Sequence, residues 1–151
     1  MLIIGIDPDT DKSGVAVVVD GKIVDLMTSS LIEFRVLIPE WVRMGAHFAL
    51  ESIEETKPTF NRGVNTKANT RISQNVGAVK QQAKNIRLEL EHYGAQYTLI
   101  KPLTGTAKTC KKNAEFFNKY TGWHKKSNAD QRDAAMLALN LHSRLKRGGR
   151  G

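Results

Sequence analysis

The chain has 151 residues, and its 23 lysines and arginines exceed its 15 aspartates and glutamates by a formal charge of +8. This length predicts one domain with its own core, and a single cysteine, Cys110, excludes an intrachain disulfide and a cysteine zinc cluster. No apolar stretch approaches the roughly 20 residues that cross a bilayer, so we expect no membrane segment, no signal peptide and a cytoplasmic location. The charge favours polyanionic partners, nucleic acid first and acidic membrane surface second.

Two apolar runs at the start of the chain, residues 2–6 and 15–19, predict a β-hairpin. The first run meets Asp7 at its end, and a carboxylate at the end of a buried strand needs a partner. One interpretation is a turn aspartate whose side chain accepts hydrogen bonds from nearby backbone N–H groups. The sequence Asp-Gly-Lys at 20–22 then predicts a tight turn into a third strand over 23–27.

The middle of the chain predicts a helix, a strand and a long loop. Ser30 and Glu33 form a capping-box pattern for a helix toward residue 44, and Pro39 is expected to kink or divide that helix. Residues 46–51, with the sequence AHFALE, predict a buried strand ending in Glu51. Residues 56–75 are polar and basic without periodicity, which predicts a long loop with a functional role.

Apolar residues at steps of three and four predict a helix over 74–93, whose stripe faces the core or, as the lesser alternative, a dimer partner. Residues 96–101 predict a fifth strand, and helices are expected over about 107–120 and from 127 or 128 to about 144. We expect one domain over 1–146 and a basic disordered tail over 147–151. The order of these elements predicts an α/β domain with a mixed sheet.

Two further acids, Asp130 and Asp133, lie three residues apart on the last predicted helix and are therefore neighbours on one face. The face continues through Ala134, Leu137 and Leu141, so both acids extend an apolar stripe, where an unpaired carboxylate costs several kcal/mol. Asp130 alone has a simpler interpretation as a first-turn acid favoured by the helix dipole. Asp133 lies deeper in the stripe, and that interpretation does not extend to it.

Four acids that end or extend buried surfaces require a common compensating charge: Asp7, Glu51, Asp130 and Asp133. A divalent cation supplies such a charge, and Mg²⁺ takes carboxylate oxygens together with water and substrate phosphate. Two such ions about 4 Å apart activate a water and stabilise the leaving oxygen of a phosphodiester. The pattern therefore indicates metal-assisted phosphodiester hydrolysis.

In chain order, the stretches IIGIDPDTDKSGVAVV, FALE and NADQRDAAMLAL resemble the RuvC-like Holliday-junction resolvases of the ribonuclease H-like superfamily. The resemblance implies an α/β ribonuclease H-like fold, with a mixed five-stranded sheet flanked by helices. It implies Mg²⁺ with Mn²⁺ as a substitute, two ions in each active site, and catalytic and metal-binding roles for the same four acids: Asp7, Glu51, Asp130 and Asp133. The segment TGTAK at 104–108 resembles the family's G-x-G-x-A-x-K segment and would place Lys108 beside DNA.

The chain departs from the family pattern in three places. Asp9 stands where the family commonly has glycine, so the turn after the first strand is more acidic. No aromatic residue follows Glu51 closely, and Phe60 is the nearest candidate for the family's wedge. The loops are short and divergent, which suggests a phage-encoded or otherwise specialised branch.

We therefore expect a metal-dependent endonuclease that resolves Holliday junctions or other branched DNA. Basic residues are expected to contact phosphates or the branch point: Lys101, Lys108, Lys111 and Lys112 near the site, and Arg62, Lys67 and Arg71 on the long loop. The resemblance also implies a homodimer, because a four-way junction presents two symmetry-related strands. The stripe of the helix over 74–93 could supply the interface.

Two alternatives stay open at this point. A non-catalytic module that binds branched nucleic acid would keep the fold and the basic surface, although it would not require all four acids. A related nuclease could act on structured RNA instead of DNA. The sequence does not rank these substrates.

Overall fold

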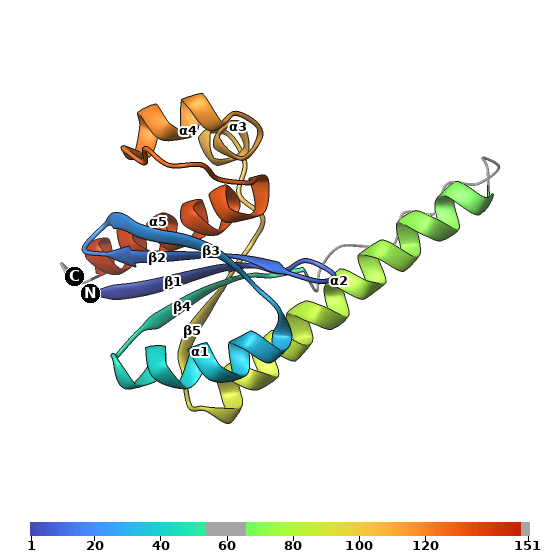
Figure 1. Ribbon diagram of the computed structural model, residues 1–151, viewed down its shortest axis with the longest axis horizontal. Coiled ribbons are helices and arrows are strands. Elements are labelled where there is room, and N and C mark those ends of the chain that lie inside the picture. The colour runs from blue at the N-terminus through green and yellow to red at the C-terminus, as the bar shows by residue number, and fades with distance from the viewer. Residues whose placement is uncertain (54–65, 149–151) are drawn as a thin grey trace.

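The computed structural model describes residues 1–53 and 66–148, and the side chains of 66–75 lie outside the description. The sheet lies between helices on both faces (Figure 1). The elements in chain order are β1 (Leu2–Asp7), β2 (Ser13–Val19), β3 (Lys22–Ser29), α1 (Leu31–Arg43), β4 (His47–Glu51), α2 (Thr66–His92), β5 (Gln96–Ile100), α3 (Thr106–Lys112), α4 (Ala114–Thr121) and α5 (Ala129–Gly148).

The five strands form one mixed sheet, which confirms the predicted sheet, and their order is β3-β2-β1-β4-β5. β1, β2 and β3 pair antiparallel, whereas β4 pairs parallel with β1 and with β5. The turn between β2 and β3 has positive φ at Asp20 and at Gly21, as the predicted tight hairpin turn requires. The parallel pairs are joined through helices, because parallel strands need a crossover connection.

Helices α1 and α2 cover one face of the sheet and α5 covers the other, with α3 and α4 outside α5 (Figure 1). Successive side chains of a strand point to opposite faces of the sheet, so the side chains of β1 are shared between these two layers. Ile4 and Ile6 belong to the core cluster on the α1 and α2 side, whereas Ile3 packs with Leu137 of α5. Asp7 follows Ile3 in this alternation, so its side chain belongs to the α5 side.

Two glycines allow α5 to lie directly on the strands. A Cβ atom built on Gly5 of β1 would lie 2.0 Å from the carbonyl oxygen of Ala134, and one on Gly14 of β2 would lie 2.3 Å from that of Asp130. No side chain fits in either space. The first turns of α5, which carry Asp130 and Asp133, are thereby held against the end of β1.

We expect Gly5→Ala to destabilise the protein by about 1–3 kcal/mol or more, because the added methyl must push α5 away from β1. The urea midpoint of unfolding measures this change. Gly77→Ala is the matched control: nothing lies within 4 Å of a Cβ there, so in α2 it should stabilise by about 0.5–1 kcal/mol. Parent-like stability of Gly5→Ala would contradict the close packing of α5.

The predicted helix boundaries are wrong at α2 and at α3 and α4. α2 begins at Thr66, so the long loop predicted over 56–75 is helical from that residue on. Its first half extends beyond the sheet (Figure 1), which explains why the sequence shows no apolar stripe there. The single helix predicted over 107–120 is two helices, because Asn113 ends α3 and its side chain accepts the Phe116 N–H to cap α4.

Other local predictions have mixed outcomes. The Ser30–Glu33 capping box is confirmed, but α1 continues through Pro39 without dividing. Proline has no N–H for the Arg35 carbonyl four residues earlier, and the Tyr93 hydroxyl donates to that carbonyl instead, at 3.4 Å. α5 continues to Gly148 rather than ending near residue 144, and residues 149–151 of the predicted tail lie outside the described residues.

The apolar stripe of α2 belongs mainly to this chain's own core. Ala83, Ile86 and Leu90 are buried, and the last two pack with the sheet and α1. They are therefore not available as the dimer interface that the sequence suggested, whereas Val76 is exposed. None of the helices within 1–53 and 66–148 is long and apolar enough to cross a membrane.

Candidate metal centre

Three carboxylates from three elements meet at one end of the sheet. Asp7 ends β1, Glu51 ends β4, and Asp133 lies on α5; each offers an oxygen atom within 4.8 Å of the others. Ile6 pairs with Leu50 in the parallel register, so the next residues, Asp7 and Glu51, lie at the same level of adjacent strands. We call these three residues the carboxylate cluster.

Burial raises the affinity of two members of the carboxylate cluster, Asp7 and Asp133, for protons. Asp7 is 4% exposed and Asp133 is 7% exposed. Burial, a hydrogen bond with Glu51 and the charges of Asp133 and Glu51 raise the pKa of Asp7 to about 10. Burial also raises the pKa of Asp133. In the protein alone the cluster therefore holds a proton at neutral pH, because two buried carboxylates beside a half-buried third cannot all ionise together.

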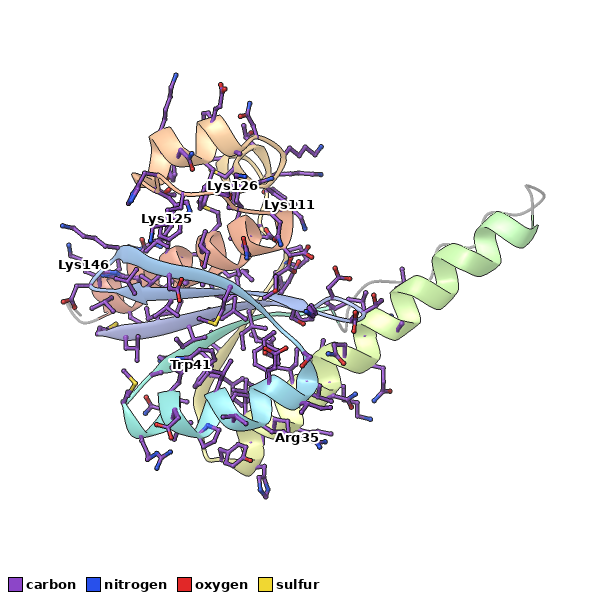
Figure 2. The ribbon with its side chains drawn as sticks, in the orientation of Figure 1. Arg35, Trp41, Lys111, Lys125, Lys126 and Lys146 are labelled. Atoms are coloured by element: carbon purple, nitrogen blue, oxygen red, sulfur yellow. The ribbon has the colours of Figure 1, made fainter. Side chains whose placement is uncertain are left out.

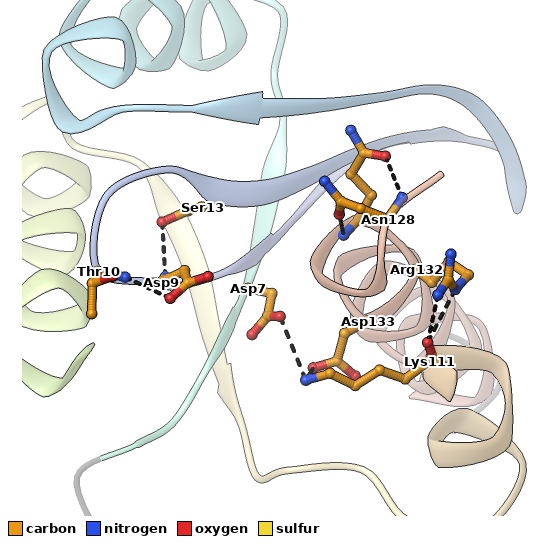
Figure 3. Close-up of polar contacts among 9 residues, drawn as sticks. Asp7, Asp9, Thr10, Ser13, Lys111, Asn128, Arg132 and Asp133 are labelled. Atoms are coloured by element: carbon orange, nitrogen blue, oxygen red, sulfur yellow. Dashed lines mark hydrogen bonds and ion pairs between the residues drawn. The ribbon is translucent and has the colours of Figure 1, made fainter. Parts of the chain in front are cut away.

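Lys111 of α3 supplies a positive charge inside the cluster. Its Nζ lies 3.3 Å from Oδ2 of Asp133 and 3.8 Å from Oδ2 of Asp7 (Figure 3). Burial alone would lower the pKa of this ammonium group, but the charges of Asp7, Asp133 and Glu51 raise it overall. Lys111 thus stays protonated and offsets part of the negative charge.

Arg132 fixes the end of α3 beside α5. Its guanidinium is buried and donates hydrogen bonds to the carbonyls of Cys110 and Lys111 and to the carbonyl of Ser127. The Ser127 hydroxyl accepts a further bond at 3.1 Å, so each guanidinium nitrogen has an acceptor and the buried charge does not lack partners. Since Arg132 precedes Asp133, it holds the backbone of Lys111 next to the cluster (Figure 3).

Asp130 lies at the edge of the cluster, beside Asp7 and Asp9. It is half-buried, and burial together with a hydrogen bond to Asp9 and the charge of Asp9 raises its pKa to about 6. Asp9 has the turn role that was considered for Asp7. Its carboxylate accepts the Thr10 N–H at 2.7 Å, and its own N–H donates to Ser13 at 3.2 Å.

The predicted DNA-contacting residues fall into three groups. Lys101, Lys108 and Lys112 are exposed, whereas Lys111 faces the cluster. Lys67 and Arg71 belong to α2 rather than to a loop, and their side chains lie outside the description. Two others lie outside the described residues altogether: Phe60 and Arg62.

Sequence reasoning missed the roles of four residues in building this site: Gly5, Gly14, Lys111 and Arg132. One signal for Arg132 was available. A basic residue in the first turn of a helix opposes the helix dipole, so it needs a specific reason to be there. Nothing in the sequence distinguished Lys111 from Lys108 and Lys112, because helix spacing alone does not say which side faces a site.

Comparison with known proteins gives a structural match only. No protein-family model and no curated protein matches the sequence. A solved structure of Thermus thermophilus RuvC in complex with a Holliday junction substrate matches with a TM-score of 0.60 and 15% identity, covering 98% of this chain and 96% of that chain. A second Thermus thermophilus RuvC structure matches with a TM-score of 0.55 and 14% identity, and covers 97% of each chain.

These similarities confirm the predicted fold. The chain has the RuvC form of the ribonuclease H-like architecture over nearly its whole length, including the mixed five-stranded sheet. Structural similarity at such low sequence identity establishes the fold, but it does not by itself establish the activity. The suggested phage-encoded branch stays a prediction.

Proposed function

We propose that the protein is a metal-dependent endonuclease that cleaves branched DNA, with the four-way Holliday junction as its first substrate. The observation that carries this proposal is the carboxylate cluster itself. Asp7, Glu51 and Asp133 are brought together from two strands and a helix, in a chain with a formal charge of +8. Gathering two buried acids and a half-buried third at one point is costly unless a cation compensates them.

The donor set fits a hard divalent cation. Carboxylate oxygens are the ligands that Mg²⁺ and Mn²⁺ prefer, and Mg²⁺ keeps open positions for water and phosphate. Asp7, Glu51 and Asp133 would hold one ion, and Asp130, beside Asp7, would extend the set toward a second ion or orient the water. When bound, the metal supplies an activated water and stabilises the leaving oxygen of the phosphodiester.

The chain's own cations would position the DNA. Lys111 lies within 3.3 Å of the cluster, so its ammonium can neutralise a phosphate brought to the same place. The exposed Lys101, Lys108 and Lys112 would bind neighbouring phosphates and set the register of the strand. Three basic residues, Arg62, Lys67 and Arg71, remain proposed for the branch point, with Phe60 as a stacking residue.

Two copies of the chain would act on one junction. C₂ symmetry of a homodimer matches the two symmetry-related strands of a four-way junction and presents one cluster to each. The first half of α2, which extends beyond the sheet, is the proposed interface, since the later apolar residues of that helix are buried within the chain. DNA as the substrate agrees with the predicted cytoplasmic location.

Metal binding is expected to release protons. Because the pKa of Asp7 is raised to about 10, Asp7 is protonated at neutral pH without metal and must lose that proton to become a ligand. Metal affinity should therefore rise with pH, by about tenfold per unit if one proton leaves. Calorimetric Mn²⁺ titrations in two buffers of different ionisation enthalpy measure the number released.

Asp7→Asn is the control for this titration, because an amide at position 7 carries no proton to release. We expect close to one proton per ion in the parent and a clear decrease in the variant. Equal release by parent and variant would show that Asp7 does not bind the metal.

The activity is tested by incubating the purified protein with four-way, three-way, flap, linear duplex and RNA hairpin substrates in Mg²⁺ or Mn²⁺. We expect cleavage of the four-way junction at paired positions in opposing strands, and no cleavage in EDTA. Preferential cleavage of the RNA hairpin would favour the RNA-processing alternative. Binding of junctions without cleavage in either metal would favour the non-catalytic module.

A further inference from the structure

A pair of exposed aromatic side chains on α4 has no role in the proposed chemistry. Phe116 is 39% exposed and Tyr120 is 58% exposed. Their ring centroids are 6.2 Å apart and their planes differ by 9°, so the two rings are stacked. Phe117 anchors the opposite side of α4 in the core, where it is fully buried.

This pair differs from the other large hydrophobic side chains that are exposed. Among the residues whose side chains the structure describes, the others in this group are aliphatic or methionine, such as Ile32 and Val36 of α1. Exposed aliphatic side chains are normal on protein surfaces, and they offer no ring face on which a base could stack. Two stacked aromatic rings on a helix of eight residues form a flat apolar surface instead.

The surroundings of the pair are strongly cationic. Residues 104–127 contain six lysines and one acid, Glu115. The lysines of this segment are Lys108, Lys111, Lys112, Lys119, Lys125 and Lys126. Lys119 follows Phe116 by three residues and is therefore its neighbour on the helix surface. We call residues 104–127, which contain α3 and α4 and lie outside α5, the outer lobe. Lys111, Lys125 and Lys126 belong to this lobe (Figure 2).

We propose that Phe116 and Tyr120 form a stacking platform for unpaired bases of the DNA, with the lysines of residues 104–127 binding the adjoining phosphates. Every base has a π-face, so stacking on aromatic rings tolerates any sequence, and cations beside the rings follow the backbone. Rings with centroids 6.2 Å apart leave less than the roughly 7 Å that a base would need between them at a base spacing of about 3.4 Å. Bases therefore stack on the two outer faces of the pair, one against each ring.

A protein partner fits this surface less well. Lysine is depleted at protein–protein interfaces, because ordering its long side chain and removing its hydration are unfavourable there. In a phosphate-binding groove the same residue gains from counterion release. Charge complementarity therefore assigns the platform to nucleic acid.

The platform connects the proposed active site to a particular feature of branched DNA. α3 carries Lys111, which faces the carboxylate cluster, and α4 follows α3 after Asn113 alone. A strand whose phosphate is held at the cluster can continue along the outer lobe with its bases exposed. A strand opened at a branch point offers such bases, whereas an intact duplex does not.

A purely structural role for the pair predicts different behaviour. Aromatic residues four apart on a helix stabilise it through their mutual contact, and leucine serves nearly as well in that role. Base stacking needs the ring itself. Leucine variants therefore separate the two roles, and Tyr120→Phe, which keeps the ring, is the conservative variant.

The test is the affinity for a fluorescent single-stranded oligothymidine, measured by anisotropy in EDTA and compared with a duplex of equal length. Phe116→Leu and Tyr120→Leu should each weaken single-strand binding by about 5- to 150-fold, the effect of losing one stacked base. Duplex binding should change less than about twofold, because it depends on phosphates. Ile32→Ala, an exposed apolar change on α1, is the matched control, and circular dichroism checks folding.

The inference rests on the proposed function only in taking DNA as the ligand, and the two can fail separately. Leucine variants with parent-like single-strand affinity would overturn the platform and leave the nuclease proposal standing. So would a Tyr120→Phe variant that binds as weakly as Tyr120→Leu. If the leucine variants lose single-strand binding while the parent cleaves no substrate in Mg²⁺, the platform stands and the nuclease proposal fails.

Discussion

Asp7→Asn and Asp133→Asn are each expected to lower the rate of junction cleavage by about a thousandfold or more. A metal centre supplies several kcal/mol of transition-state stabilisation, and each 1.36 kcal/mol lost costs about tenfold in rate. Both side chains are buried in the carboxylate cluster, so a neutral amide removes a proposed ligand without opening the site to other residues. Single-turnover cleavage in Mg²⁺ measures the effect.

Binding should be retained where cleavage is lost. Without metal, Asp7 is protonated at neutral pH, so Asp7→Asn leaves the charge unchanged and should bind junctions in EDTA as well as the parent. Asp133→Asn removes an acid that faces phosphate and should bind as well as the parent or better. Folding should survive, because at position 7 the amide replaces a protonated carboxyl of nearly the same shape, and at position 133 it relieves repulsion between neighbouring acids. Thermal unfolding in EDTA checks this, with a midpoint at or above that of the parent.

Asp25→Asn is the matched control for these variants. Asp25 is an exposed acid of β3 and lies outside the carboxylate cluster, so the same chemical change there should leave cleavage and binding unchanged. Near-normal cleavage by either cluster variant would show that the acids are structural. Unfolding of either variant would do the same.

Junction binding is expected to weaken roughly a thousandfold between about 50 and 200 mM salt, if the surface neutralises about six phosphates. The chain carries 23 lysines and arginines, which is more than enough to contact about six phosphates. Anisotropy titrations in EDTA over this salt range give the slope of log affinity against log salt. Affinity that does not change with salt would contradict phosphate binding by these residues.

Each lysine that contacts a phosphate should account for about one unit of this slope of log affinity against log salt. Lys112→Ala removes an exposed cation from α3 and should reduce the slope by about one, since each phosphate contact releases about one counterion. Lys22→Ala, an exposed cation of β3, is the corresponding control and should leave the slope unchanged. Equal slopes for parent and Lys112→Ala would remove this lysine from the DNA surface.

The strands and their terminal acids were predictable because local pattern determined them. Asp7 and Glu51 each end a run of apolar residues, and such a run in a parallel or central strand must be buried on both faces. Asp133 was predictable because it continues the apolar face of a helix. The position of four acids at the ends or edges of buried surfaces was enough to predict a shared cation from the sequence.

The rest of the site depended on contacts between distant elements. Gly5 and Gly14 read as ordinary strand residues, and their importance appears only when α5 is placed on the strands. Lys111 and Arg132 are 21 residues apart in sequence and meet through the Lys111 carbonyl. Tertiary hydrogen bonds of this kind leave no periodic signal in the sequence.

The helix boundaries were missed for local reasons. The first half of α2 lacks an apolar stripe because it extends beyond the sheet, so periodicity could not identify it. The break at Asn113 was overlooked because asparagine is tolerated inside helices, although its preference for capping positions was a usable signal.

The central claim is that Asp7, Glu51 and Asp133 hold the divalent ion that the proposed nuclease activity requires. The most direct measurement is anomalous diffraction from crystals of the protein soaked in Mn²⁺. We expect an anomalous peak bounded by these three carboxylates, with the Lys111 ammonium displaced from Asp7. A map without a peak in the cluster, with Lys111 still bridging Asp7 and Asp133, would contradict the account.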